Sequence, residues 1–166
     1  MEEIFDVVNE NDEVTGKATR KEVHDKKLIH RAVMFLTFDK KGRIFVSQRT
    51  KNKEFFKEYW SIALGGHVNS GETYDEAVVR EAKEEANINE KPFFMGSFKI
   101  RIPEESENVR VYGFVIDKKP ELDPFEIKQS MFLTMKEMKE KIKKEKFLPE
   151  TGYLLKILKN FKINLS

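Results

Sequence analysis

Six glycine, acidic and basic residues stand at a spacing that suits the binding of a divalent cation. From Gly66 the chain reads Gly66-x5-Glu72-x7-Arg80-Glu81-Ala82-x-Glu84-Glu85. Carboxylate oxygens are preferred ligands of hard cations such as Mg²⁺, which proteins usually hold through a few carboxylates together with phosphate oxygens of a substrate. The pattern therefore indicates chemistry at a phosphate group.

A helix from Thr73 to Ala86 is predicted to carry the acidic part of this pattern. Thr73 and Glu76 form a T-x-x-E capping box, which satisfies free amides of the first turn. Asn87 is a suitable terminator because asparagine tolerates the left-handed conformation that often follows a helix. Apolar residues recur at helical spacing on one side, so that side is expected to face the core.

The carboxylates of this helix lie where a surface helix would avoid them. At about 100° per residue, Glu81 and Glu85 fall within the apolar stripe and Glu84 falls at its edge. Carboxylates crowded on a partly buried face repel one another and lose hydration, so they require positive charge nearby, and Arg80 supplies only one. Helix phase alone leaves two alternatives, a metal-binding cluster or glutamates that point into solvent or pair with distant lysines.

The complete spacing resembles the Nudix box at every position except the last, where Asn87 stands in place of glycine. From the composition, the chance of such a match anywhere in the chain is roughly 10⁻⁴. The resemblance is tight over the box and looser over the flanking region from about His30 to Met138. It implies a hydrolase that depends on Mg²⁺ or Mn²⁺ and in which water attacks phosphorus. The implied substrate is a small-molecule diphosphate, namely a nucleoside diphosphate derivative.

The resemblance also implies roles for individual residues. Arg80 would orient the glutamates, and Glu72 would pair with Arg80 or hold a water molecule; with Glu81 and Glu84 they form the candidate catalytic set. The implied metal ligands are Glu81, Glu84, Glu85 and the backbone carbonyl of Gly65.

Two candidates lie outside the box. Glu126, in a later loop, is a candidate general base, and an exposed acidic residue of a loop is the alternative. Arg49, Lys51 and Lys53 follow a predicted strand and are candidates for contact with substrate phosphates, although basic residues at a strand end are more often solvated.

The three histidines of the chain form a candidate second metal site. His24, His30 and His67, with the Gly-His pair in the box, are similar to the metal-binding histidines of a Nudix subgroup related to type I isopentenyl-diphosphate isomerase. Glu105 and Glu107 correspond loosely to the paired metal-binding glutamates of that enzyme.

Gly65 argues against isomerase activity. The isomerase uses a cysteine at this position as an acid and base, and glycine has no side chain with which to transfer a proton. Hydrolysis is therefore favoured. The alternatives are isomerisation of isopentenyl diphosphate and a non-catalytic Nudix module that binds nucleotides, although a pure binder has no need of so many repelling carboxylates.

The order of predicted elements favours an α+β layer fold rather than a doubly wound sheet. The resemblance implies an α/β/α sandwich with a mixed central sheet and an N-terminal β extension, in one domain spanning residues 1–166. The predicted strands cover residues 5–8, 13–16, 32–38, 44–47, 60–64, 93–102 and 109–116. The predicted helices cover residues 19–27, 73–86, 135–146 and 150–161.

Composition excludes several other kinds of function. The 31 basic and 29 acidic residues leave a net charge of +2, so neither nucleic acid nor an anionic membrane is an expected partner. Cysteine is absent, which excludes disulfides, zinc–thiolate sites and cysteine nucleophiles. No run of 18 apolar residues occurs, so we expect a cytoplasmic protein. The expected oligomeric state is a monomer or a homodimer.

Overall fold

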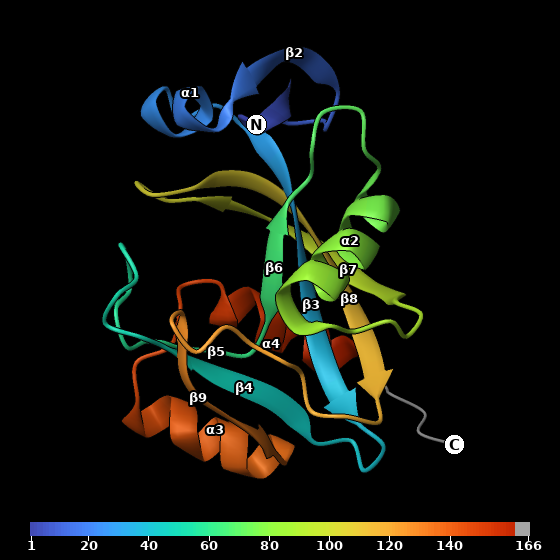
Figure 1. Ribbon diagram of the computed structural model, residues 1–166, viewed down its shortest axis with the longest axis vertical. Helices are drawn as coiled ribbons and strands as arrows, with labels where there is room; N and C mark the ends of the chain where they lie inside the picture. Colours follow the sequence, from blue (N-terminus) through green and yellow to red (C-terminus); the bar gives the residue numbers. More distant parts are fainter. Residues whose placement is uncertain (162–166) are drawn as a thin grey trace.

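The computed structural model describes residues 1–161, which form nine strands and four helices (Figure 1). The strands are β1 (Ile4–Val8), β2 (Val14–Thr19), β3 (His30–Asp39), β4 (Ile44–Arg49), β5 (Trp60–Ser61), β6 (Leu64–His67), β7 (Phe93–Arg101), β8 (Ser106–Ile116) and β9 (Ile127–Leu133). The helices are α1 (Arg20–Asp25), α2 (Tyr74–Ala86), α3 (Met135–Lys144) and α4 (Thr151–Asn160).

The nine strands form one mixed sheet centred on β3. β3 pairs in parallel with β8, from His30 opposite Glu107 to Asp39 opposite Ile116, and antiparallel with β1, β4 and β6. β2 continues the sheet beyond β1, β7 lies outside β8, and both β5 and β9 pair with β4. The predicted α+β class with a mixed sheet and an N-terminal β extension is therefore confirmed.

Helices cover both faces of the sheet, so the predicted α/β/α sandwich is also confirmed. Successive side chains of a strand point to opposite faces. Val33 and Phe35 of β3 accordingly pack with α2, while Leu36 packs on the other side with Met138 of α3 and Leu154 of α4. Because β3 is buried on both faces, its sequence is almost continuously apolar.

Local sequence fixes the ends of α2. The Thr73 side chain accepts a hydrogen bond from the Glu76 amide and the Glu76 side chain accepts one from the Thr73 amide, as the capping box predicts. Asn87 ends the helix in the left-handed conformation with φ 52°.

The N-terminal extension, formed by β1, β2 and α1, has a small core of its own. Phe5, Ala18 and Val23 are buried together. The extension is tied to the segment before α2, since the Ser70 hydroxyl donates to Asp6 at 2.7 Å. This arrangement brings α1, which carries His24, close to the start of β3.

Two predictions about strands are wrong in detail. The strand predicted at residues 60–64 is two short strands, β5 and β6, that pair with different partners. β9 was not predicted, because Lys128, Gln129 and Ser130 interrupt its apolar residues. Pairing along β4, from Ile44 opposite Leu133, stabilises it despite this composition.

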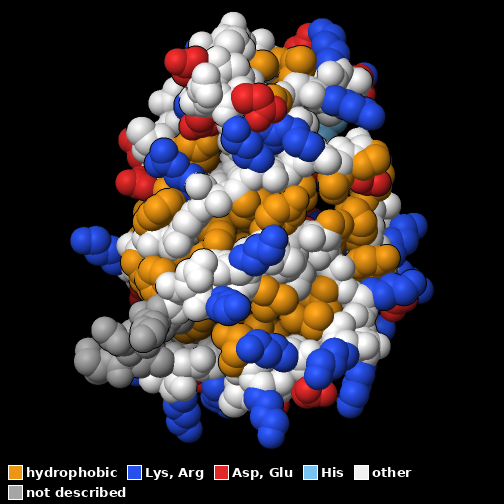
Figure 2. Space-filling model, turned by 180° about the vertical axis from the view of Figure 1, so that it is seen from behind, with side chains coloured by type: hydrophobic (Ala, Val, Ile, Leu, Met, Phe, Trp, Pro, Cys, Tyr) orange, Lys and Arg blue, Asp and Glu red, His pale blue; other side chains and the backbone are white. Residues whose placement is uncertain are grey.

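No helix among residues 1–161 is both long and apolar enough to cross a membrane. Figure 2 shows the molecule from behind, where a band of hydrophobic side chains is bordered by scattered Lys and Arg side chains. The basic side chains of this face do not merge into one patch, in keeping with the small net charge.

Candidate active site

β6 and α2 hold the carboxylate of Glu81 against a strand position that has no side chain. A Cβ atom on Gly66 would lie 2.2 Å from the carboxylate carbon of Glu81, so any other residue here would displace this carboxylate from its observed position. Glu81 is only 8% exposed, and burial raises its pKa although the neighbouring Arg80 partly offsets the effect. The prediction that Glu81 faces inward is confirmed.

Arg80 connects the acidic residues of the motif. Its guanidinium donates to both carboxylate oxygens of Glu72, at 2.8 and 2.9 Å, in a bidentate pair. The same group donates to Glu81 at 2.7 Å, to Glu84 at 3.2 Å and to the carbonyl oxygen of His67 at 2.9 Å. Burial opposes ionisation of Glu72, but the hydrogen bonds from Arg80 outweigh it and lower the pKa of Glu72. Arg80 thus holds three carboxylates in fixed positions.

The prediction that Glu85 lies within the apolar stripe of α2 is wrong. Glu85 and Glu84 are both exposed, because the buried face of the helix ends beside a pocket and Glu85 forms part of the pocket wall. Neighbouring groups nevertheless raise the pKa of Glu85. The largest cause is loss of solvation, and the charges of Glu81, Glu126 and Glu84 add to it. Negative charge is concentrated where α2 meets this pocket.

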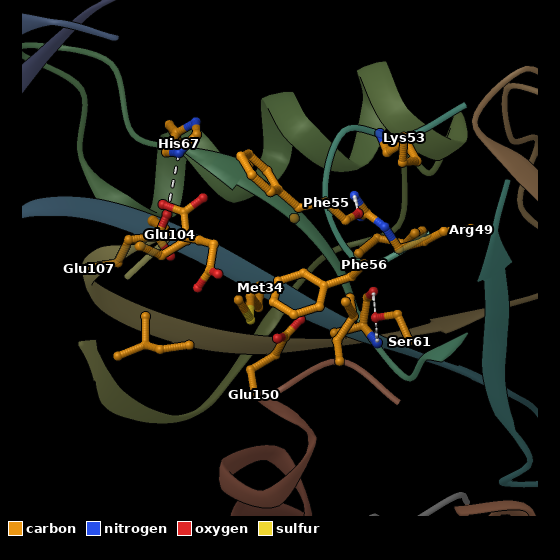
Figure 3. A pocket seen from close by; sticks show the side chains of 18 of the residues that line it. Met34, Arg49, Lys53, Phe55, Phe56, Ser61, His67, Glu104, Glu107 and Glu150 are labelled. Atoms are coloured by element: carbon orange, nitrogen blue, oxygen red, sulfur yellow. Dashed lines mark hydrogen bonds and ion pairs between the residues drawn. The ribbon is translucent and has the colours of Figure 1, made fainter. Parts of the chain in front are cut away.

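The pocket has a volume of about 350 Å³, within the range of sites for small molecules. In Figure 3, His67 and Glu107 lie at one end, Arg49 lies at the other, and Met34 and Phe56 lie between them. The floor is formed by β3 and the segment from Ala63 to His67.

The loop candidates lie at the wall of the same pocket. Lys53 pairs with Glu126 at 2.8 Å, and both residues contribute to the lining. Arg49 also lines the pocket; it donates to the carbonyl oxygen of Phe55 at 3.1 Å, and its buried Nε has no hydrogen-bond partner. Lys51 is exposed and does not line the pocket, so the structure gives no support to its predicted contact with phosphate.

The three histidines form a cluster, as their positions in the sequence suggest. The ring centroids of His24, His30 and His67 are 5.1 to 5.8 Å apart, and Phe5 stacks on His30. One nitrogen from each histidine and one carboxylate oxygen of Glu105 lie within 4.8 Å of one another. The Nδ1 atoms of His24 and His30 lie 2.6 and 3.0 Å from backbone carbonyl oxygens, which leaves Nε2 of each free to face the cluster.

Glu107 and Glu105 complete the histidine cluster. The Oε1 atom of Glu107 lies 3.6 Å from Nε2 of His30 and 3.3 Å from Nε2 of His67. Burial opposes ionisation of Glu107, but the close approach of the two imidazoles lowers its pKa; burial and the charge of Glu107 raise the pKa of Glu105. The Nε2 of His30 and one oxygen of Glu105 are buried without a hydrogen-bond partner.

Gly65 is closely packed against the neighbouring strand. A Cβ atom at this position would lie 2.2 Å from the carbonyl oxygen of Val33, a backbone atom of β3 that cannot move independently of the sheet. The site therefore has no room for the cysteine that the isomerase uses here.

Replacing Gly65 with Ala is expected to lower the free energy of unfolding by about 1–3 kcal/mol, the usual effect of overpacking. Chemical denaturation measures this difference. Gly16→Ala is the matched control, because a Cβ atom at Gly16 would have no neighbour within 4 Å. Equal stability of the two variants would show that β3 moves aside easily.

One ionisable residue of the pocket, Glu150, has no local sequence signal that points to a functional role. Glu150 precedes α4 and lines the pocket. In the sequence it has the ordinary signature of an acidic residue at a helix start, where the helix dipole favours negative charge. Its position beside the pocket depends on the long-range packing of α4, which no local pattern reveals.

Comparisons with known proteins agree with this geometry. The model of the NUDIX domain family matches residues 28–151. The chain is 42% identical over 91 residues to an uncharacterized Nudix hydrolase of Streptomyces coelicolor, a match covering 55% of this chain and 50% of that protein. It is 28% identical to an uncharacterized Nudix hydrolase of Nostoc, a match covering 98% of this chain and 97% of that protein. The crystal structure of DR0079 from Deinococcus radiodurans is similar with a TM-score of 0.78 and 27% identity, covering 96% of this chain and all of that one.

Proposed function

The chain belongs to the Nudix family, and from this premise we propose that it hydrolyses a diphosphate linkage in a nucleoside diphosphate derivative, with Mg²⁺ or Mn²⁺ as cofactor. The observation that carries the proposal is the set of α2 carboxylates: Arg80 holds Glu81 and Glu84, and Glu85 lines the pocket. The uncharacterized relatives share the hydrolase class but not a known substrate.

The residues at this site fit a hard divalent cation. The donor set consists of carboxylate oxygens, which Mg²⁺ prefers over nitrogen or sulfur. Loss of solvation and repulsion between carboxylates raise the pKa values of Glu81 and Glu85, so a cation placed between them would relieve both effects. Glu81, Glu84 and Glu85 would hold the cation, with the carbonyl of Gly65 as a further ligand.

The other residues would then position substrate and water. A bound Mg²⁺ or Mn²⁺ would polarise phosphoryl oxygens and lower the pKa of a nearby water molecule. Arg80 and Glu72 act as positioning residues, since Arg80 fixes the glutamate side chains. Arg49 and Lys53 are suited to contact phosphate oxygens, and Glu126 is suited to accept the proton of the attacking water.

The isomerase alternative is disfavoured because Gly65 offers no proton-transfer group and no space for one. A non-catalytic binding module remains the second candidate. It would bind the same ligand without releasing a product.

A panel assay distinguishes these functions. Nucleoside di- and triphosphates, dinucleotides, nucleotide sugars and prenyl diphosphates are incubated with Mg²⁺ or Mn²⁺, and released phosphate is measured. We expect release from at least one nucleotide and none from isopentenyl diphosphate. Binding without release would favour the binding module, and migration of the double bond would favour the isomerase.

We further propose that the histidine cluster holds a second metal ion. Three imidazoles and a carboxylate suit a borderline transition metal such as Zn²⁺, whereas Mg²⁺ prefers an all-oxygen site. The Nε2 of His30 and one oxygen of Glu105 support this assignment, since both are buried polar atoms without a hydrogen-bond partner. The ligands would be His24, His30, His67 and Glu105, with Glu107 beside them.

His24→Gln is expected to weaken Zn²⁺ binding by at least about tenfold. The substitution removes one ligand from the partly exposed wall of the cluster, so it should leave the fold intact. Calorimetric titration of Zn²⁺ measures the effect, with Lys21→Gln on the exposed surface of α1 as control. Unchanged affinity in His24→Gln would rule out this ligand set.

A further inference from the structure

One carboxylate of the pocket lies apart from both candidate metal sites. Glu150 occupies the N-cap position of α4, yet its side chain makes no capping hydrogen bond. It points into the pocket instead. In Figure 3 it lies beside Met34 and Phe56, away from His67 and from Lys53.

Among residues 1–161, the Glu150 carboxylate has no hydrogen-bond donor besides its own backbone amide. Burial raises the pKa of Glu150 and the charge of Glu107 adds to this, while its own backbone amide and the charge of Arg49 offset the shift in part. A partly buried carboxylate in this condition is stabilised by a ligand that brings N–H groups to it.

The walls around Glu150 are apolar and suited to a flat ring. Met34, Phe56 and Leu148 line this part of the pocket. The nearby hydroxyl of Ser61 is already used, because it donates to the carbonyl oxygen of Ala63 at 2.6 Å. An aromatic ring can pack between such side chains, whereas a purely apolar prenyl chain would cover the Glu150 carboxylate without offering it a hydrogen-bond donor.

We propose that Glu150 recognises an exocyclic amine on the nucleobase of the substrate. An ionised carboxylate only accepts hydrogen bonds, so it attracts an amine N–H and repels a carbonyl oxygen at the same place. This inference rests on the proposed function and makes it more specific: the preferred substrates are nucleoside diphosphate derivatives whose base carries an amine.

Two nucleotide pairs test the inference. Cytidine and uridine diphosphates differ by an amine and a carbonyl, and guanosine and inosine diphosphates differ by one amine. Hydrolysis of both pairs is measured at pH 8 with Mg²⁺, and the pair that reacts faster is used. In that pair we expect the nucleotide with the amine, cytidine or guanosine diphosphate, to have a kcat/KM at least about tenfold higher than its partner without it. Because an amide both donates and accepts, Glu150→Gln should reduce this ratio to within about threefold. Glu140→Gln, a change of an exposed carboxylate outside this pocket, should leave the ratio unchanged.

Binding is measured separately from turnover. Calorimetry with the non-hydrolysable α,β-methylene analogues of the same four nucleotides should give the same preference and the same response to Glu150→Gln. Equal affinities, no affinity, or an unchanged preference in Glu150→Gln would overturn the inference. An amine preference in binding without hydrolysis of any nucleotide would support the inference and contradict the proposed hydrolase function.

Discussion

The Glu85→Gln variant is expected to lose at least about a thousandfold in kcat, or roughly 4 kcal/mol of transition-state stabilisation, while its melting temperature stays the same or rises. The two effects have different causes. Activity falls because the variant removes one negative charge from the proposed cation site beside the pocket. Stability does not fall because, among residues 1–161, Glu85 has no ion pair, and its pKa is raised by partial loss of solvation at the pocket wall and by neighbouring carboxylates. Neutralising it relieves that repulsion.

Thermal denaturation and steady-state hydrolysis of the best substrate in the panel test this prediction together. Glu90→Gln is the matched control, an exposed carboxylate just beyond the same helix, and should change neither property. A Glu85→Gln variant that loses stability and activity together would indicate a structural role. Full activity would remove Glu85 from the catalytic site.

The Arg80→Met variant is expected to lose about 3 kcal/mol of unfolding free energy, because removing one partner leaves Glu72 and Glu81 in a partly buried site without compensating charge. For a chain of this length, this corresponds to a fall in melting temperature of roughly 6–12 °C. Hydrolysis should also be lost, since the carboxylates would no longer be held in fixed positions.

Chemical denaturation measures the free energy of unfolding of Arg80→Met and of the control variant Lys83→Met. Lys83 is exposed on the same helix, so its replacement should change stability by less than about 0.5 kcal/mol. Adding Glu81→Gln to Arg80→Met should recover part of the loss, because one of the unpaired charges is then removed. Equal stability of the two methionine variants would contradict the role assigned to Arg80.

The sequence predicted the parts of this site that depend on local spacing. The capping box at Thr73, the left-handed Asn87 and the inward position of Glu81 all follow from helix geometry and are confirmed. The strand predicted at residues 32–38 is also confirmed, as the central part of β3.

The sequence could not predict features that depend on long-range packing. β9 has too many polar residues for a local signal and exists because β4 offers it a partner. The edge of the buried face of α2 depends on where the pocket opens, so Glu85 was placed wrongly. Glu150 carried only the signal of a helix start, and its approach to Met34 results from the packing of α4.

The most direct test of the central claim is hydrolysis in ¹⁸O-labelled water, with the products analysed by mass spectrometry. If water attacks phosphorus beside the α2 carboxylates, each turnover places one ¹⁸O atom on a phosphorus of one product. This incorporation should require Mg²⁺ or Mn²⁺ and should be lost in Glu85→Gln. Label bound to carbon, or no incorporation with any nucleotide of the panel, would contradict it.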